Sequence, residues 1–323
     1  MHLLKEQTYE PGSFLVFTTV EWAQRHEEGQ SIAGRKKPVG DQSWIFSPVF
    51  PFTEGKEYVA FYPGVPLLRF EIPKPVYPTT KLVAIYPKLD VVPENLLKMY
   101  LHFSAPMSVG NSYQHLQWGN AQGDTLILPF LELEPELWNE DRTRLTLWLD
   151  PGRVKRDLVP NQLLGAPLVA GKEYTLVVDK NWKDIHGNPL ARDFLLSIRV
   201  GEADRERPKP EAWKLIQPKA GSKEALVLQF GEALDYALLQ RAITVWNQED
   251  QQIKGQIQIG SKQATWHFHP NHPWQTGDYK IMIDSTLEDL AGNNLNRNFD
   301  VDLQAQEQQD ISKPYHTLLL SIH

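Results

Sequence analysis

The stretch Tyr174-Thr-Leu-Val-Val-Asp179 returns later in the chain as Tyr279-Lys-Ile-Met-Ile-Asp284, at a constant offset of 105 residues. The offset then holds without a gap at Trp182/Leu287, Asp184/Asp289, Gly187/Gly292, Asn188/Asn293, Leu190/Leu295 and Phe194/Phe299. Self-similarity at one fixed offset is the signature of repeated structural units. The sequence therefore predicts tandem copies of one fold.

A partial third copy lies near the start of the chain. Trp44-x-Phe46-x-Pro48 matches Trp266-x-Phe268-x-Pro270 at an offset of 222 residues. Proline pairs at Pro73-Lys-Pro75 and Pro208-Lys-Pro210 precede the second and third copies, and paired prolines stiffen a linker. We expect an Ig-like β domain over 1–78, β-sandwiches over 79–203 and 204–305, and a tail strand within 306–323.

The repeated blocks are typical of short β-strands. Tyr174, Leu176 and Val178 alternate on one face of such a strand, and turn residues bound the blocks. No segment shows a helical stripe of useful length. Many short strands between turns indicate an all-β protein made of tandem immunoglobulin-like sandwiches.

Two local patterns support the sandwich. Tyr58, Tyr174 and Tyr279 stand where such folds place a tyrosine whose hydroxyl bonds back to the preceding backbone. The Asp-x-x-Gly-Asn turns that begin at Asp184 and Asp289 are expected to join the last two strands, because Asp closes Asx turns and Gly adopts positive φ. Phe194 and Phe299 are then expected to mark the final strand of each copy.

These residues also carry a family resemblance. Phe103-Ser-Ala-Pro-Met107, the Gly-x-Tyr strand and the Asp-x-x-Gly-Asn turn resemble the bacterial Ig-like domain named after the surface-layer protein SbsA, over roughly residues 79–305. The resemblance implies a sandwich module common in exported, cell-surface and lipoprotein chains of bacteria. It implies no activity, since such modules serve mostly as spacers, adhesive units or accessory domains.

Composition excludes some kinds of function. The formal charge of −7 gives no support to a nucleic-acid partner, and the absence of cysteine removes disulfides, thiolate metal sites and a cysteine nucleophile. No cofactor is expected. The apolar run Phe14–Val20 is too short to span a bilayer, and Glu6 disrupts a signal peptide at the start. The resemblance points to the cell envelope or the extracellular space, and the missing signal leaves the cytoplasm open.

A histidine-rich strand is the first candidate site. His267 and His269 are two residues apart, so in a strand both point to one face, and His272 follows in the loop, a geometry that can share a metal. We favour an ordinary solvent-facing strand edge, because no fourth ligand stands at a diagnostic spacing. The Asp-x-x-Gly-Asn turns offer too few oxygens for calcium.

A cationic loop is the second candidate. Arg153, Lys155 and Arg156 follow a predicted strand and would bind a carboxylate, a sulfated sugar or a phosphate. We favour a solvated structural loop that is neutralised by nearby acids such as Asp150, although no other loop is a better candidate for binding. Trp274 lies near a turn, where an exposed ring would stack on a sugar, but we favour burial at a domain junction.

No catalytic signature is present: the sequence holds no Gly-x-Ser-x-Gly elbow, His-Glu-x-x-His helix, phosphate loop or dinucleotide fingerprint. We therefore expect no enzyme. The first hypothesis is a structural or adhesive protein of the bacterial cell envelope, acting as a spacer or scaffold toward protein or polysaccharide. The second is a carbohydrate-binding accessory protein, and the third is a hydrolase of unfamiliar type.

Overall fold

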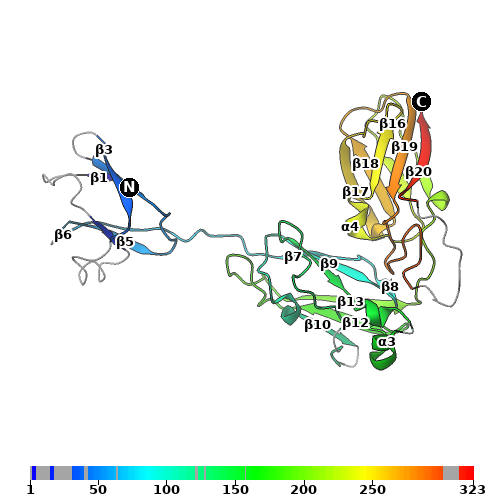
Figure 1. Ribbon diagram of the computed structural model, residues 1–323, viewed down its shortest axis with the longest axis horizontal. Helices are drawn as coiled ribbons and strands as arrows, with labels where there is room; N and C mark the ends of the chain where they lie inside the picture. The colour runs from blue at the N-terminus through cyan, green and yellow to red at the C-terminus, as the bar shows by residue number, and fades with distance from the viewer. Residues whose placement is uncertain are drawn as a thin grey trace. The chain divides into compact units, whose positions relative to one another are not determined.

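The computed structural model describes residues 2–4, 15–17, 31–39, 43–62, 65–120, 123–126, 129–156, 158–300 and 313–323. The chain divides into two compact units, residues 1–78 and residues 79–323 (Figure 1). We call the first the N-terminal unit. The second contains two sandwiches, which we call the second sandwich (residues 79–203) and the third sandwich (residues 204–323). The fold is all-β, with tandem immunoglobulin-like sandwich domains, as the sequence predicted.

The N-terminal unit has two three-stranded sheets, β1-β4-β3 and β2-β5-β6. Their strands are β1 (His2–Leu4), β2 (Leu15–Phe17), β3 (Gly34–Val39), β4 (Ser43–Pro48), β5 (Glu57–Tyr62) and β6 (Val65–Glu71). Val16, Phe46 and Ala60 form the centre of its core, and Trp44 and Phe52 pack against them.

The second sandwich pairs the sheet β10-β12-β13-β8 with the sheet β11-β9-β7. Its strands are β7 (Leu82–Tyr86), β8 (Val91–Pro93), β9 (Lys98–Phe103), β10 (Leu116–Asn120), β11 (Arg144–Trp148), β12 (Glu173–Val178) and β13 (Phe194–Gly201). Short helical turns lie between them: η1 (Ser112–His115), α2 (Pro151–Val154) and α3 (Val159–Leu164). Strand β8 joins β13 in parallel, whereas the other pairs are antiparallel.

The third sandwich pairs the sheet β14-β15-β18-β17 with the sheet β16-β19-β20. Its strands are β14 (Lys214–Ile216), β15 (Leu226–Gln229), β16 (Ile243–Asn247), β17 (Gly255–Ile259), β18 (Thr265–Pro270), β19 (Gly277–Asp284) and β20 (Tyr315–Ile322). Its short helical turns are η2 (Pro210–Ala212), α4 (Tyr236–Leu239) and η3 (Ser261–Gln263). No helix in the described ranges is long and apolar enough to cross a membrane.

The repeated motifs build the same structures in different copies. The Tyr58 hydroxyl accepts a hydrogen bond from the Thr53 amide at 2.7 Å, and the Tyr279 hydroxyl donates to the Gln275 carbonyl at 3.1 Å. These bonds confirm the tyrosine corner at both positions. Tyr174 likewise makes a hydrogen bond with the backbone of Val169.

The Asp-x-x-Gly-Asn turns are also alike. Asp184 Oδ1 accepts the amides of His186 and Asn188, both at 2.9 Å. Asp289 Oδ1 accepts the amides of the equivalent residues two and four positions later, at 2.8 and 3.0 Å. The aspartate therefore closes each turn through its own side chain, as the sequence predicted.

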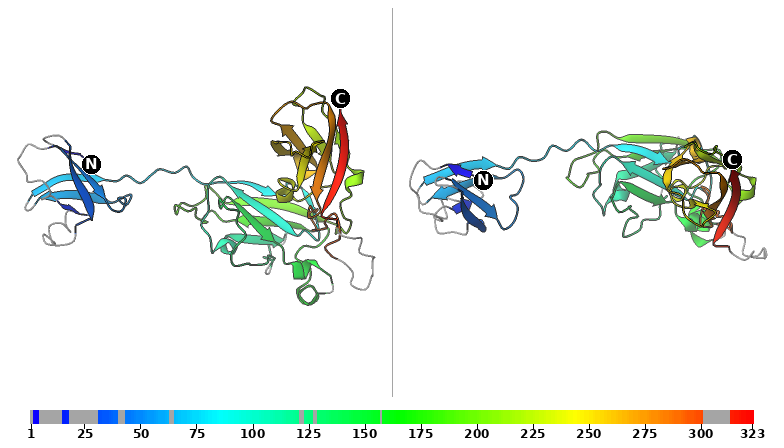
Figure 2. Two further views of the ribbon diagram at one scale, coloured as in Figure 1. Left: turned by 45° about the horizontal axis from the view of Figure 1, so that its top comes forward. Right: turned by 90° about the horizontal axis from the view of Figure 1, so that it is seen from above.

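The final strand of the third sandwich differs from the prediction. Phe194 begins β13, but Phe299 lies outside any strand, and the place beside β19 belongs to β20 (Figure 2). Phe299 instead packs against the core of the second sandwich. The expectation that Phe299 marks a strand was therefore wrong, because this segment buries its apolar side chain in the neighbouring sandwich. The strand within the range expected for a tail completes the third sandwich.

Candidate functional site

The cations of the predicted binding loop each have a structural partner. Arg153 is 6% exposed, and its Nε donates to the Gly165 carbonyl at 3.0 Å. Lys155 Nζ lies 4.2 Å from the centre of the Phe299 ring, and Arg156 Nε donates to Asp300 Oδ2 at 2.8 Å. The loop therefore anchors the 299–300 segment of the third sandwich to the second. A ligand-binding role for these residues stays a prediction.

Trp274 belongs to the core of the third sandwich. Its side chain is 3% exposed, and its Nε1 donates to the Glu224 carbonyl at 2.8 Å. The ring lies between Phe268 and Tyr279, with ring centres at 6.0 and 5.3 Å. The N-terminal unit has the same row of rings in Phe46, Phe52 and Tyr58. Trp274 thus occupies a core position of the repeat, and its ring offers no open face to a sugar.

The three histidines lie along one strand and the loop after it. His267 is half-buried with its Nε2 3.1 Å from Thr265 Oγ1, while His269 and His272 are exposed. In the part of the chain that the structure describes, the group of three ligand atoms close enough to share a metal ion does not include them. Metal binding by His267, His269 and His272 remains a prediction with no geometric support.

That group consists of Asp204, Glu232 and Asp289, whose carboxylate oxygens lie within 4.8 Å of one another. Asp204 follows β13, Glu232 follows β15, and Asp289 closes the turn after β19. The cluster therefore stands where the two sandwiches meet. Carboxylates suit hard cations, and three of them supply part of the six to eight oxygens that calcium takes.

Crowding perturbs the acids of this cluster. Burial, reinforced by the charges of Asp204 and Glu206, raises the pKa of Glu232 to about 7. Burial also raises the pKa of Asp289 to about 7, where hydrogen bonds from Asn293 oppose the shift and the charges of Asp204 and Glu232 add to it. Near neutral pH the cluster therefore carries less than its full negative charge.

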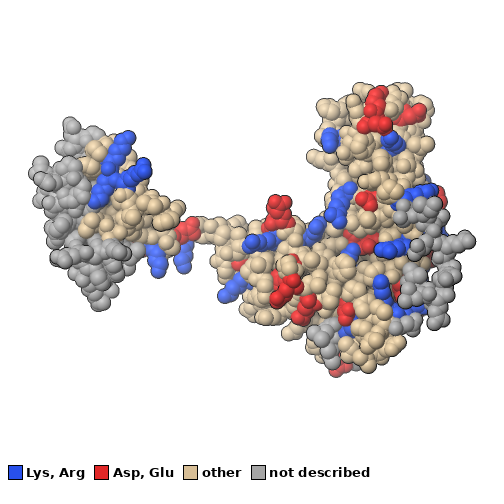
Figure 3. Space-filling model, in the orientation of Figure 1, with Lys and Arg blue, Asp and Glu red and all other residues tan. Residues whose placement is uncertain are grey.

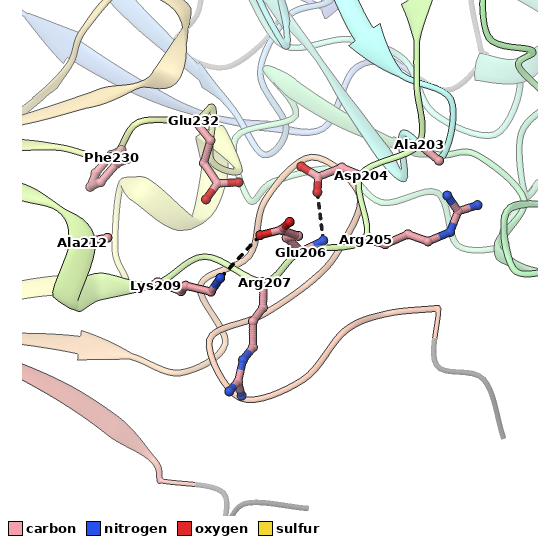
Figure 4. A pocket seen from close by; sticks show the side chains of 9 residues that line it. All are labelled: Ala203, Asp204, Arg205, Glu206, Arg207, Lys209, Ala212, Phe230 and Glu232. Carbon is pink, nitrogen blue, oxygen red and sulfur yellow. Dashed lines mark hydrogen bonds and ion pairs between the residues drawn. The ribbon is translucent and has the colours of Figure 1, made fainter. Parts of the chain in front are cut away.

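Two hollows adjoin the cluster. One, of about 540 Å³, is lined by Asp204, Glu206, Lys209, Phe230 and Glu232 among others. In Figure 4 the carboxylates of Asp204, Glu206 and Glu232 face the same space, whereas Arg205 and Arg207 point away from it. The other hollow, of about 450 Å³, shares Asp204 and Glu232 and is otherwise mostly apolar.

Backbone and amide hydrogen bonds join the sandwiches at this point. Asn95 Nδ2 donates to the Asp204 carbonyl at 2.6 Å, and the Asp204 amide donates back to Asn95 Oδ1 at 2.8 Å. The Leu97 amide donates to the Leu290 carbonyl at 2.9 Å. Gly292 has φ of +84°, and a Cβ there would lie 2.4 Å from Leu97 Cδ2. The left-handed backbone conformation favours glycine, and a Cβ there would force the buried Leu97 side chain to move.

Charged side chains bridge the sandwiches beside these bonds. The Tyr100 hydroxyl donates to Asp235 Oδ2 at 2.5 Å, and Asp235 Oδ1 in turn caps α4 by accepting the Leu238 amide at 2.8 Å. Lys98 forms an ion pair with Glu288. Burial raises the pKa of Glu288 even though Lys98 opposes the shift. Polar side chains of the two sandwiches are therefore paired with each other across the contact.

Stacked rings complete the contact. Tyr86 of the second sandwich and Tyr236 of the third lie with ring centres 3.5 Å apart and planes 13° apart. His102 meets Tyr236 edge-on at 5.3 Å. Burial, with the nearby charges of Arg144 and Lys88, lowers the pKa of His102 to about 4, so this ring is neutral at physiological pH.

The sequence pointed to only one member of the acidic cluster. Asp289 was visible as the first residue of its turn, but Asp204 and Glu232 belong to segments far away in the sequence. The sequence did indicate that the third copy directly follows the second, because only the short segment around Pro208 lies between them. The sequence did not show which side chains of the second and third sandwiches would face each other across the contact.

No family model matches the chain, and no curated protein matches it. Among solved structures, native alpha-2-macroglobulin from Escherichia coli (domains MG0-NIE-MG1) aligns at 11% identity over 76% of this chain and 71% of that chain, with a TM-score of 0.26. The S-layer protein rSbsC(31-844) aligns at 12% identity over 63% and 23%, with a TM-score of 0.26. The FN1-FN3 domains of chicken CNTN1 align at 12% identity over 96% and 90%, with a TM-score of 0.20.

Proposed function

We propose that the chain is a non-catalytic structural protein of the bacterial cell envelope, in which the second and third sandwiches act together as one stiff spacer or scaffold. The contact between these sandwiches carries the proposal. Domains joined only by a linker move freely, whereas a contact with buried, mutually satisfied polar groups favours one orientation. The Tyr100–Asp235 bond is such a buried pair, and the half-buried Lys98–Glu288 ion pair and the Tyr86/Tyr236 ring stack add to the contact.

We further propose that the repeats are Ig-like domains of the SbsA type. The motifs that support this are the Asp-x-x-Gly-Asn turns and the tyrosine corners, which form the expected hydrogen bonds. The envelope location and a protein or polysaccharide partner rest on that resemblance. Figure 3 shows acidic and basic side chains intermingled on the visible surface after residue 79, which gives no support to a polyanion as the partner.

The carbohydrate-binding alternative receives less support. Its predicted platform, Trp274, is buried in the third sandwich, and the fully buried side chains also include Trp118 and Trp182. A buried ring cannot stack on a sugar. The scaffold hypothesis needs no such ring.

Distance measurement between spin labels tests the stiffness. Because the chain has no cysteine, each introduced cysteine is a unique labelling site. We would label Glu173→Cys with Glu249→Cys, exposed positions in the second and third sandwiches, and measure the distance distribution by pulsed electron resonance in the full chain. We expect one narrow distribution, because the contact fixes the orientation.

The control pair lies within one sandwich: Asp141→Cys with Glu173→Cys, both exposed. The width of its distance distribution shows what is expected for two labels on one rigid body. Replacing both stacked rings by alanine, at Tyr86 and Tyr236, should broaden only the distribution between sandwiches. A broad distribution between sandwiches in the unaltered contact would reject the stiff spacer.

A further inference from the structure

A groove of about 680 Å³ lies in the second sandwich, and its lining includes no member of the acidic cluster. Two loops line it, one over residues 109–114 and the other over residues 132–142. Its volume is within the range of small-molecule and side-chain binding pockets. Among the residues that the structure describes, none of those named above in the contact between the sandwiches lines this groove.

Hydrogen bonds between the two loops fix the shape of the groove. Glu136 accepts the Gly110 amide at 3.0 Å and the Ser112 amide at 2.7 Å. The Tyr113 hydroxyl accepts the Leu133 amide at 3.2 Å and donates to the Leu131 carbonyl at 3.2 Å. A groove held in this way is formed before any ligand arrives, which lowers the entropy cost of binding.

Aromatic rings line the groove. Trp138 and Tyr113 are both half-buried there. The indole N–H of Trp138 is already engaged, since it donates to Glu136 Oε2 at 2.8 Å. The ring packs against Phe103 and Trp182, with ring centres at 5.8 and 5.9 Å. Trp138 is therefore held in place and can offer a ligand its π system rather than a hydrogen bond.

The walls carry a surplus of negative charge. Besides Glu136, the lining includes Glu132, Glu134 and Glu140, against a single cation, Arg142. Glu132, Glu134 and Glu140 are exposed, and none of these three has an ion-pair partner among the described residues. They are available to a cationic ligand.

One buried acceptor in the lining has no hydrogen-bond partner. Asn111 Nδ2 lies 3.2 Å from His115 Nε2, and His115 Nδ1 lies 3.5 Å from Asp179 Oδ2. A proton on Nδ1 facing the carboxylate makes Nε2 the acceptor of the Asn111 amide. That assignment leaves Asn111 Oδ1, which is buried beneath the lining, without a hydrogen-bond partner.

We propose that this groove binds an arginine side chain of a partner polypeptide. A guanidinium group is planar, stacks on aromatic rings, carries positive charge and has five N–H donors with no acceptor. These properties complement a preformed groove that is lined by aromatic rings and by a surplus of exposed glutamates. A neutral sugar also stacks on aromatic rings, but it brings hydroxyls that need donors as well as acceptors, and the lining is rich in acceptors.

Fluorescence anisotropy of the full chain tests the proposal. The probe is a fluorescein-labelled, acetylated hexapeptide of alternating arginine and glycine, and its matched control has citrulline in place of arginine. Citrulline keeps the planar shape but removes the charge. We expect the arginine peptide to bind at least about tenfold more tightly, because charge-assisted bonds to carboxylates are the stronger ones.

A pair of double variants locates the binding. Glu132→Gln with Glu134→Gln removes two exposed charges from the groove and should weaken binding of the arginine peptide about tenfold. Glu173→Gln with Glu249→Gln changes the net charge equally at exposed positions outside the groove, and should change Kd less than about twofold. All four side chains are exposed, so the fold should tolerate each change.

Three results would overturn the proposal. They are no binding of the arginine peptide at millimolar concentration, equal weakening in the two double variants, and binding of a neutral oligosaccharide at this groove in place of the peptide. The groove lies within one sandwich, so these outcomes are independent of the spin-label distances. A stiff spacer without arginine binding, and arginine binding without a stiff spacer, are both distinguishable results.

Discussion

The two aspartates of the repeated turns have the same local geometry and opposite electrostatics. Asp184 and Asp289 are each 2% exposed and each accept two backbone amides. Asp184 also accepts the Thr80 hydroxyl at 2.8 Å, and these bonds outweigh burial and lower its pKa. Asp289 instead faces other acids, and its pKa rises to about 7. The sequence motif therefore determines the conformation of the turn, whereas the neighbouring residues determine the pKa of its aspartate.

This difference predicts opposite effects of pH. Because the folded-state pKa of Asp289 lies above its ordinary value near 3.9, its contribution to the free energy of unfolding is complete at low pH and is lost as pH rises through about 7. Asp289→Asn removes that titration. Relative to the unaltered chain, the variant should gain about 2 kcal/mol between pH 5 and pH 8, measured by urea unfolding.

Asp184→Asn is the matched control. Its lowered pKa gives stability that is present above the ordinary value and is lost only at more acidic pH, so nothing titrates between pH 5 and pH 8. We expect a constant loss of about 1–2 kcal/mol across that range, because the charged acceptor is gone. Parallel pH profiles for both variants would contradict the environment assigned to Asp289.

Residues with local roles were predictable from the sequence. In a tyrosine corner and in an Asx turn the hydrogen-bond donor and acceptor lie within a few residues of each other. A short sequence motif therefore includes both partners of the bond. For Trp274 the sequence favoured burial over a surface platform without deciding between them, because aromatic residues suit both positions. Only the neighbouring rings of Phe268 and Tyr279 decide that it is buried.

At the scale of elements, β20 shows why the repeat offset misled us. The offset placed Phe299 opposite Phe194, but residues 299 and 300 contact the second sandwich through Lys155 and Arg156. The final strand had therefore to come from later in the chain. Along β20, Leu320 and Ile322 lie in the core while Leu319 is 77% exposed. This alternation is what a core-facing strand requires.

Two adjacent leucines test the assignment of β20 to the core. Leu320→Ala empties a position that is 4% exposed and should cost about 2–5 kcal/mol in the free energy of unfolding. Leu319→Ala, one position earlier on the opposite face, should cost less than about 0.5 kcal/mol. Chemical unfolding of the third sandwich, followed by amide hydrogen exchange in β19, measures both. Equal costs would mean that β20 is a tail and not part of the sheet.

The sequence predicted which segments form strands more reliably than it predicted how the sandwiches contact each other. Strands such as β12 and β19 carry their own alternation, whereas the contact between sandwiches joins residues more than 100 positions apart, such as Tyr100 and Asp235. Nothing in either segment alone indicates its partner. The acidic cluster was missed for the same reason, since its three carboxylates belong to three separate segments.

At the scale of the whole molecule, the contact between the sandwiches couples their stabilities. The Tyr100 hydroxyl donates across the contact to Asp235, which also caps α4. Burial and the charge of Asp235 raise the pKa of Tyr100, which keeps its proton on the hydroxyl. Losing this donor from a buried carboxylate therefore weakens both the contact and the start of the helix beside it.

Tyr100→Phe removes that donor while keeping the ring, so we expect a loss of about 1.5–3 kcal/mol. Hydrogen exchange at increasing urea would follow β12 in the second sandwich and β19 in the third. If the two sandwiches unfold as one cooperative body, their midpoints coincide in the unaltered chain and fall together in the variant. Tyr315→Phe, at a ring 49% exposed, should leave both midpoints unchanged. A shift in only one strand would show that the sandwiches fold independently, because a shared transition cannot lose stability on one side alone.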